Sequence, residues 1–267
     1  MDKRRMCPQC RAFITTDDRV CPYCHEKVSP RAVDRRDPGA ILGGFIPHAR
    51  YTTIIILLIN FGMYAATLAL TSTVGESGAL DLLGEKNGRI FVYHQWWRLV
   101  TAGFLHGGLF HILMNSWALF DLGAQVEEVY GTSRMIVLYF LSTVCGFFLS
   151  ALMHPMGPSV GSSAGIFGLI GAMIALGVRH RSALGDHIRG LYMRWAVYGL
   201  LFGLLPGMDN AAHIGGIAAG FCAAYVAGLP RISGGVTETL WRVISFICLG
   251  VTAMCFLEMY LSFAAQK

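Results

Sequence analysis

The residues of this chain that could do chemistry are polar side chains within long apolar segments. Ser163 is the central residue of Gly161-Ser162-Ser163-Ala164-Gly165, a Gly-x-Ser-x-Gly pattern that is typical of a hydroxyl at a tight turn into a helix. His213 lies near the start of a later apolar segment, and a hydroxyl beside an imidazole is the pairing that nucleophilic catalysis uses. Taken singly, a serine in a span usually bonds to its own helix and a histidine usually packs, so both interpretations stay open at this point.

Three more residues share the helical faces on which this chemistry would occur. His111 and Asn115 are four residues apart and therefore lie on one face of a helix. Phe167 follows Ser163 by four residues, so its ring is expected on the Ser163 face, where it could hold the imidazole of His213 flat. Polar groups are costly inside a bilayer and suggest function there.

The elements that must position these side chains are predicted to be membrane-spanning helices. Hydrophobic residues make up 54% of the 267 residues, charged residues 14%, and mean hydropathy is +0.53, whereas soluble domains have about 25% charged residues. This composition excludes a soluble globule, a disordered chain and a disulfide-stapled secreted fold. Segments that suit a span of about 20 residues lie near 52–73, 104–125, 135–153, 163–179, 191–206, 212–229 and 241–262.

Depth along these segments predicts that the polar residues meet. At about 1.5 Å per residue, Ser163, His213 and His111 each lie about 24–27 Å from the charged residue near the far end of their segment. In a hydrocarbon core of about 30 Å all three lie just below the same surface. Gly216 and Gly220 form a GxxxG pattern that lets two helices approach closely, which a Ser163–His213 hydrogen bond requires.

The distribution of Lys and Arg predicts the orientation. With seven spans and the N-terminus inside, 17 of the 21 Lys and Arg residues lie on the cytoplasmic side. The net charge of +5 is therefore interpreted as topology rather than as a nucleic-acid footprint. The first 20 residues are polar and Cys-rich, so no secretory signal is expected there. We expect a multi-pass protein of the bacterial inner membrane with its C-terminus outside.

Four cysteines before the first span predict a metal site. Cys7, Cys10, Cys21 and Cys24 form two CxxC pairs, and four thiolates suit a closed tetrahedral zinc site. A reducing cytoplasm disfavours disulfides. We expect a structural zinc ribbon over residues 1–27 and a linker over 28–51. Iron instead of zinc, or two redox-active pairs, are the alternatives, and the sequence does not indicate the partner of the ribbon.

Together the motifs resemble the rhomboid family of intramembrane serine proteases over about residues 52–229. The matching elements are Trp97-Arg98, the His106, His111 and Asn115 spacing, Glu127 with Gly131, the Ser163 pentapeptide, and Ala212-His213-Ile214-Gly215-Gly216. At Phe167 the family commonly has Tyr. The resemblance implies an all-α polytopic fold with a six-helix core over 52–229, and a loop with one extra C-terminal transmembrane helix over 230–267.

The resemblance also implies an activity and its residues. Ser163 and His213 would form a catalytic dyad that cleaves transmembrane segments of membrane proteins near the outer face. His111 and Asn115, with the Ser163 amide, would hold the oxyanion, and neither a catalytic cofactor nor a nucleic acid is needed. Asp209 is interpreted as a solvated residue at the mouth of the site, and His106 as a residue that shapes the cavity.

The substrate must expose a peptide bond that a helix normally hides. We therefore expect helix-weakening residues near the cleaved bond and a substrate that enters beside the short fifth segment. The aromatic residues of 74–103 are expected to shield the other side. Two other functions stay open: a catalytically silent rhomboid-like protein that binds membrane clients, and a small-solute transporter, although spans four and six lack paired ion ligands.

Overall fold

The computed structural model describes residues 4–7, 9–15, 18–28, 50–180, 182–229 and 235–265. The chain forms two compact units, Met1–His48 and Ala49–Lys267. Nearly all of the predicted linker 28–51 lies outside the described residues, and so do residues 230–234 of the predicted last loop.

The first unit is a small ribbon built on two similar turns. Strands β1 (Arg4–Met6) and β2 (Phe13–Thr15) pair in antiparallel register. At each CxxC pair the backbone closes in the same way, because the amide of Arg11 donates to the Cys7 carbonyl and the amide of His25 donates to the Cys21 carbonyl, each at 2.9 Å. Arg11 and His25 both have positive φ angles, 59° and 56°. This repeated turn directs both cysteines of each CxxC pair towards one point.

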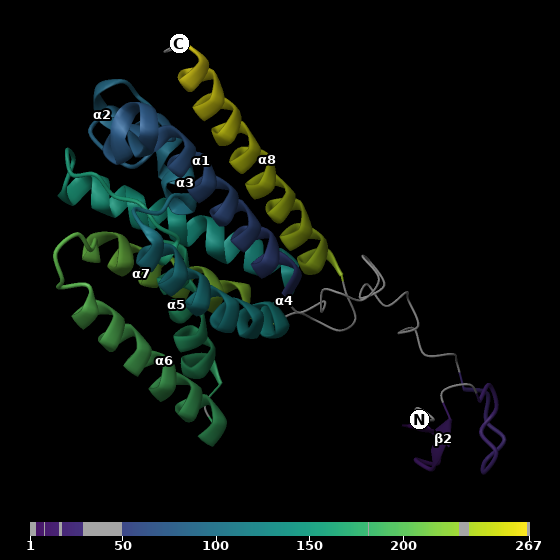
Figure 1. Cartoon of the computed structure of the whole chain (residues 1–267). Coiled ribbons are helices and arrows are strands. Elements are labelled where there is room, and N and C mark those ends of the chain that lie inside the picture. Colours follow the sequence, from purple (N-terminus) through teal and green to yellow (C-terminus); the bar gives the residue numbers. More distant parts are fainter. Residues whose placement is uncertain are drawn as a thin grey trace. The chain divides into compact units, whose positions relative to one another are not determined.

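The second unit is a bundle of helices (Figure 1). Its elements are α1 (Tyr51–Leu82), α2 (Arg89–Val92), α3 (Arg98–Thr101), the 3₁₀ turn η3 (Ala102–Phe104), α4 (Leu109–Met153), α5 (Ser163–Arg179), α6 (Ala183–Phe202), α7 (Asn210–Ala227) and α8 (Val236–Ala264). Helices α6 and α8 lie on opposite sides of the bundle, with α4, α5 and α7 between them (Figure 1).

Glycines divide the two longest helices. Gly75 in α1 and Gly131 in α4 both have φ 76°, a left-handed conformation that ends one helix and begins another. Helix α4 is therefore two helices, and these correspond to the second and third predicted spans. Each of the seven predicted segments falls largely within a helix of the described part of the chain, and the prediction of an all-α polytopic fold is confirmed.

Two predicted boundaries are wrong. The segment 104–125 begins as a helix only at Leu109, because residues 102–108 form η3 and a loop. The predicted segment 191–206 begins too late and also ends too late, because α6 runs from Ala183 to Phe202. The first turns of α6 contain the charged residues Asp186 and Arg189. An apolar pattern therefore does not predict this part of the helix.

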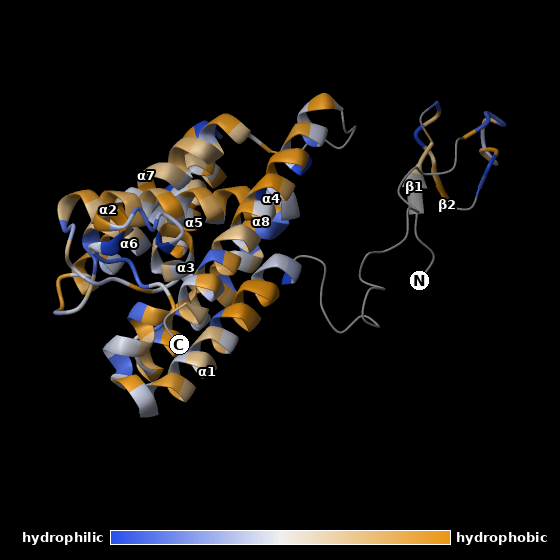
Figure 2. Ribbon diagram, turned by 90° about the horizontal axis from the view of Figure 1, so that it is seen from above, coloured by the Kyte–Doolittle hydropathy of each residue, from blue (hydrophilic) through white to orange (hydrophobic). Residues whose placement is uncertain are grey.

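The length and composition of the helices suit a membrane. Among the described residues, α1, α4, α7 and α8 are long and apolar enough to cross a bilayer, and α5 is a shorter apolar helix. Many large apolar side chains of the bundle are exposed, and much of the ribbon of its helices has the orange colour of hydrophobic residues in Figure 2. Lipid rather than water suits such a surface.

Helix α5 is the centre of the bundle, since every residue from Ala164 to Gly177 is buried. Its backbone touches that of α7 at glycines. A Cβ atom at Gly220 would lie 1.9 Å from the Gly168 carbonyl oxygen, and one at Gly216 would lie 2.2 Å from the Ala164 carbonyl oxygen. Small residues are therefore required where α5 and α7 cross, as the GxxxG pattern predicts.

Buried polar contacts fix the Arg179 end of the bundle. The Glu127 carboxylate, 3% exposed, accepts hydrogen bonds from the Thr52 amide at 2.9 Å and the Thr52 hydroxyl at 2.6 Å, so it caps the start of α1. Arg134 forms a bidentate ion pair with Glu238 at 2.7 and 2.9 Å. This second contact ties the extra helix α8 to α4.

Candidate active site

The structure brings Ser163 and His213 into hydrogen-bond contact. Ser163 is the first residue of α5, and its Oγ lies 3.0 Å from Nε2 of His213 in the first turn of α7. Gly161, two residues before Ser163, has φ 128°, and its amide donates to the Ala102 carbonyl at 2.9 Å. This left-handed glycine forms the tight turn that places the hydroxyl at the start of the helix.

Asn210 orients the imidazole of His213, a role that was not predicted from the sequence. Asn210 Nδ2 donates to the Leu200 carbonyl at 3.2 Å, so Asn210 Oδ1 faces Nδ1 of His213 at 3.2 Å. An oxygen acceptor at this position requires a proton on Nδ1. Nε2 then carries the lone pair, and this is the tautomer that can take a proton from Ser163.

Phe167 lies flat on the imidazole of His213, where the sequence placed it. The ring centroids are 4.1 Å apart and the planes differ by 17°. Both side chains are buried, and the Phe167 ring lies so close to Gly199 of α6 that a Cβ there would be 2.5 Å from Phe167 Cζ. Contacts with both α6 and His213 therefore hold the Phe167 ring in place, and the stacked ring restricts rotation of the imidazole.

The interpretation of Asp209 as a solvated residue is wrong. Its carboxylate accepts hydrogen bonds from the Ala212 amide at 3.1 Å and from the Ser150 hydroxyl. Asp209 therefore caps the start of α7 and joins that helix to the end of α4. Because Asn210 faces Nδ1 of His213, Asp209 is also not a third member of a Ser–His–Asp arrangement.

His111 and Asn115 converge on the turn that precedes Ser163. A Cβ at Gly161 would lie 2.8 Å from His111 Nε2 and 3.4 Å from Asn115 Nδ2. Among the described residues, Nδ2 of Asn115 is buried without a hydrogen-bond partner. An unpaired buried donor costs about 1–3 kcal/mol. A free donor beside a nucleophile can donate a hydrogen bond to an oxyanion, which is an acceptor that forms only during the reaction.

His106 and Ser162 form a buried pair behind the site. Both side chains have no exposed surface, and Ser162 Oγ lies 3.4 Å from His106 Nε2. The His106 ring meets the His111 ring edge-on, with centroids 5.1 Å apart. His106 thus packs against His111, and its role in shaping the cavity stays a prediction. Ser162 points away from His213.

Two cavities reach His111 from different sides. One, of about 590 Å³, lies between α4 and α6 and is lined by Trp117, Trp195, Tyr198, Ser163, His213 and other mainly apolar side chains. The other, also of about 590 Å³, has Glu76, Glu85 and Ser159 among its lining residues. The site is therefore open to an apolar ligand on one side and to a polar environment on the other.

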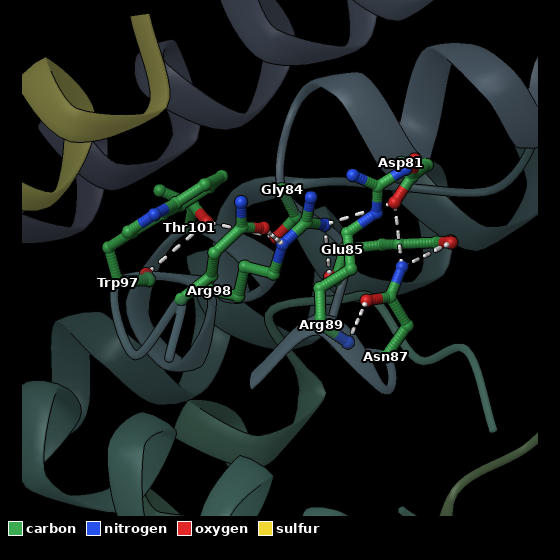
Figure 3. Close-up of polar contacts among 9 residues, drawn as sticks. Asp81, Gly84, Glu85, Asn87, Arg89, Trp97, Arg98 and Thr101 are labelled. Carbon is green, nitrogen blue, oxygen red and sulfur yellow. Dashed lines mark hydrogen bonds and ion pairs between the residues drawn. The ribbon is translucent and has the colours of Figure 1, made fainter. Parts of the chain in front are cut away.

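Arg98 holds the loop over residues 83–101, which we call the Arg98 loop (Figure 3). Its guanidinium donates to the Gln95 side chain at 2.7 Å and the Glu85 carbonyl at 2.9 Å, and it lies 3.3 Å from the Asp81 carboxylate. Burial lowers the pKa of Arg98 to about 10, and Asp81 opposes that shift. Arg98 therefore remains charged at neutral pH.

The ribbon cysteines have the geometry of a metal site. The four sulfur atoms lie within 4.8 Å of one another, with Cys7 and Cys24 at 3.7 Å and Cys10 and Cys21 at 3.6 Å. Zinc–sulfur bonds of about 2.3 Å in a tetrahedron place sulfurs about 3.8 Å apart, so the cluster can hold such an ion. The Cys10 amide holds the pKa of the Cys7 thiol at about 7, which favours the thiolate that binds metals.

A bundle with these motifs at its centre belongs to a known class. Residues 93–230 match the family described as Rhomboid domain, and the chain therefore belongs to the rhomboid family. It is a multi-pass membrane protein.

Individual relatives include proteins with and without a protease name. The chain is 30% identical over 218 residues to "Rhomboid protease GluP" of Bacillus subtilis, covering 81% of this chain and 42% of that protein. It is 34% identical to "RHOMBOID-like protein 6, mitochondrial" of Arabidopsis thaliana, covering 61% and 52%. It is 37% identical to "Inactive RHOMBOID-like protein 8" of Arabidopsis thaliana, covering 46% and 36%. The chain thus spans about a third to a half of the length of these relatives.

Proposed function

We propose that this protein is an intramembrane serine endopeptidase with Ser163 and His213 as its catalytic dyad. The observation that carries the proposal is the 3.0 Å contact between Ser163 Oγ and His213 Nε2 within a membrane bundle. The tautomer favoured by Asn210 leaves Nε2 free to act as the base. One relative carries the word inactive in its name, so membership of the family does not by itself imply catalysis. The argument for catalysis is therefore the geometry of this site.

In the first half of the reaction, Ser163 Oγ attacks the carbonyl carbon of the scissile peptide bond while its proton passes to His213 Nε2. The oxyanion accepts hydrogen bonds from the Ser163 amide, His111 and Asn115. The C–N bond then breaks, and His213 returns the proton to the leaving amine. An acyl-enzyme remains on Ser163.

In the second half, water attacks the ester carbon and His213 takes the water proton. Collapse of the second oxyanion releases the new carboxyl end of the substrate and restores the proton to Ser163. Water would reach this step through the polar cavity lined by Glu76, Glu85 and His111. The apolar cavity between α4 and α6 would admit the transmembrane segment, beside the helix that corresponds to the predicted fifth segment.

The layout and orientation of the chain complete the proposal. Residues 1–27 form a ribbon that holds structural zinc through its four cysteines, 28–51 a linker, 52–229 the protease core, and 230–267 a loop with the extra helix. The N-terminus is cytoplasmic in a bacterial inner membrane, so the dyad faces the outer side. Substrates are transmembrane proteins with helix-weakening residues near that face.

Cleavage of a tagged transmembrane test substrate in proteoliposomes tests the proposal. Ser163→Ala and His213→Ala are expected to abolish cleavage, whereas Ser162→Ala, whose hydroxyl points towards His106, should largely keep it. Loss with Ser162→Ala and retention with Ser163→Ala would overturn the assignment. If no substrate is cleaved but folded protein captures transmembrane clients, the catalytically silent alternative is supported instead.

A further inference from the structure

Lys86 is a buried cation in the Arg98 loop for which the catalytic chemistry has no role. Its side chain is among the largest that are fully buried, with 1% of its surface exposed. Nζ donates to the carbonyls of His154 and Gly157, each at 2.8 Å. Both acceptors lie in the segment 154–160, which connects α4 to the turn before Ser163.

The backbone of Lys86 holds the same segment. The Lys86 amide donates to the Ser159 carbonyl at 3.0 Å, and the Ser159 amide donates to the Lys86 carbonyl at 2.9 Å. Two residues further on, the Gly161 amide bonds to Ala102. The segment before Ser163 is therefore held by main-chain bonds at Ser159 and Gly161, and Lys86 Nζ holds its carbonyls at His154 and Gly157.

Lys86 also acts on the helix that carries His213. Burial lowers the pKa of Lys86, and the nearby carboxylates of Asp209 and Glu85 oppose that shift. Asp209 caps α7 one turn before His213. A buried ammonium is tolerated only when it is hydrogen-bonded and its charge is compensated. Here its acceptors precede Ser163, and the first of its two compensating carboxylates, Asp209, precedes His213.

We propose that Lys86 is a positioning residue that clamps the 154–160 segment, and with it the turn at Gly161, so that Ser163 Oγ stays within reach of His213 Nε2 and the oxyanion donors. The proposal rests on the proposed protease function. Lys86 touches no reacting atom. Its loss lets the segment move and lengthens the Ser163–His213 contact, which slows acylation without weakening substrate binding in the apolar cavity.

The test compares Lys86→Met, Lys86→Gln and Arg89→Met in the full chain. Methionine keeps the length of the side chain but has no donor, and glutamine keeps one amide that can serve one carbonyl. Arg89 is a matched control, since it is a cation in the same loop whose ion pair is with Asp81 and not with 154–160. Each variant is measured by kcat and KM on the tagged substrate and by thermal melting in detergent.

Lys86→Met is expected to lower kcat at least tenfold per folded molecule with KM within twofold of wild type. Lys86→Gln should fall between Lys86→Met and wild type, and Arg89→Met should match wild type. Unchanged kcat per folded Lys86→Met molecule would overturn the proposal. If that variant does not fold, a Lys86→Gln kcat equal to wild type overturns it in the same way.

Hydrogen exchange separates this proposal from the proposed function. The amides of Ser159 and Gly161 should exchange at least tenfold faster in Lys86→Met than in wild type, and should not change in Arg89→Met. This readout needs no catalysis. Faster exchange in a protein that cleaves nothing would refute the protease while keeping the clamp, and unchanged exchange would refute the clamp in an active enzyme.

Discussion

The imidazole of His213 lies parallel to the ring of Phe167, 4.1 Å from it and tilted by only 17°. This stacking fixes the plane of the proposed base, while Asn210 fixes its rotation within the plane. The two restraints come from different elements, α5 and α7, that meet only because glycines let their backbones touch.

Replacing Phe167 tests the stacking contact. Aromatic pairs contribute about 0.5–1.5 kcal/mol beyond their buried area, so Phe167→Leu is expected to lower kcat by about 2–10-fold with little change in KM. Phe167→Tyr keeps the ring and should retain most of the activity. Equal kcat for the leucine and wild-type proteins would show that the base needs no ring beside it.

Asn210 and Asp209 are adjacent, but replacing each with alanine is expected to affect kcat and stability differently. Asn210→Ala removes the acceptor for Nδ1 of His213, so kcat should fall by about 10–100-fold with little loss of stability. Asp209→Ala removes a helix cap, which costs about 1 kcal/mol, and also a carboxylate near the buried Lys86, so it should lower the melting temperature. Rates and thermal melts of both variants check this, and a wild-type kcat in Asn210→Ala would show that Nδ1 of His213 needs no acceptor at this position.

The crossing of α5 and α7 has no room for a methyl group. Gly220→Ala would place Cβ 1.9 Å from the Gly168 carbonyl, and overpacking of this kind costs about 1–3 kcal/mol. We expect a lower melting temperature and slower cleavage. The control is Gly62→Ala in α1, where no atom lies within 4 Å of the new Cβ, so its stability should be unchanged or higher. Equal stability of the two variants would contradict the crossing.

The ribbon is expected to bind one metal ion independently of catalysis. Cys10→Ser removes one of four sulfur ligands, so elemental analysis of purified protein should show zinc in wild type and its loss in the variant. The cleavage rate in detergent should stay within twofold of wild type. Zinc retained by Cys10→Ser, or iron found in wild type, would refute the proposed site.

Much of the fold could be predicted from sequence because apolar length and polar exceptions are local signals. The convergence of Ser163, His213, His111 and Asn115 followed from depth along each helix and from small residues at the crossing. The GxxxG pattern also required the close α5–α7 contact that the structure shows.

The remaining features depend in part on partners far apart in the chain. Asn210 shows its role only when Leu200 of α6 fixes its amide. Asp209 caps α7 through the nearby Ala212 amide, but its link to α4 depends on Ser150. Asp121 is an acidic residue within an apolar segment, and the sequence alone does not explain it. In the structure its carboxylate accepts from Gln125 Nε2 at 3.2 Å, and Tyr192 donates to Gln125 Oε1 at 2.6 Å. The contacts with Leu200, Ser150 and Tyr192 join different helices, so spacing within one segment does not reveal them.

A fluorophosphonate probe applied to purified, folded protein tests the nucleophile most directly, because only a serine activated by a neighbouring base reacts rapidly. Mass spectrometry of wild type is expected to find the adduct on Ser163. The adduct should be absent from Ser163→Ala, strongly reduced in His213→Ala and nearly unchanged in Ser162→Ala. Folded wild-type protein that stays unlabelled, or that carries the adduct on Ser162, would contradict the Ser163–His213 dyad.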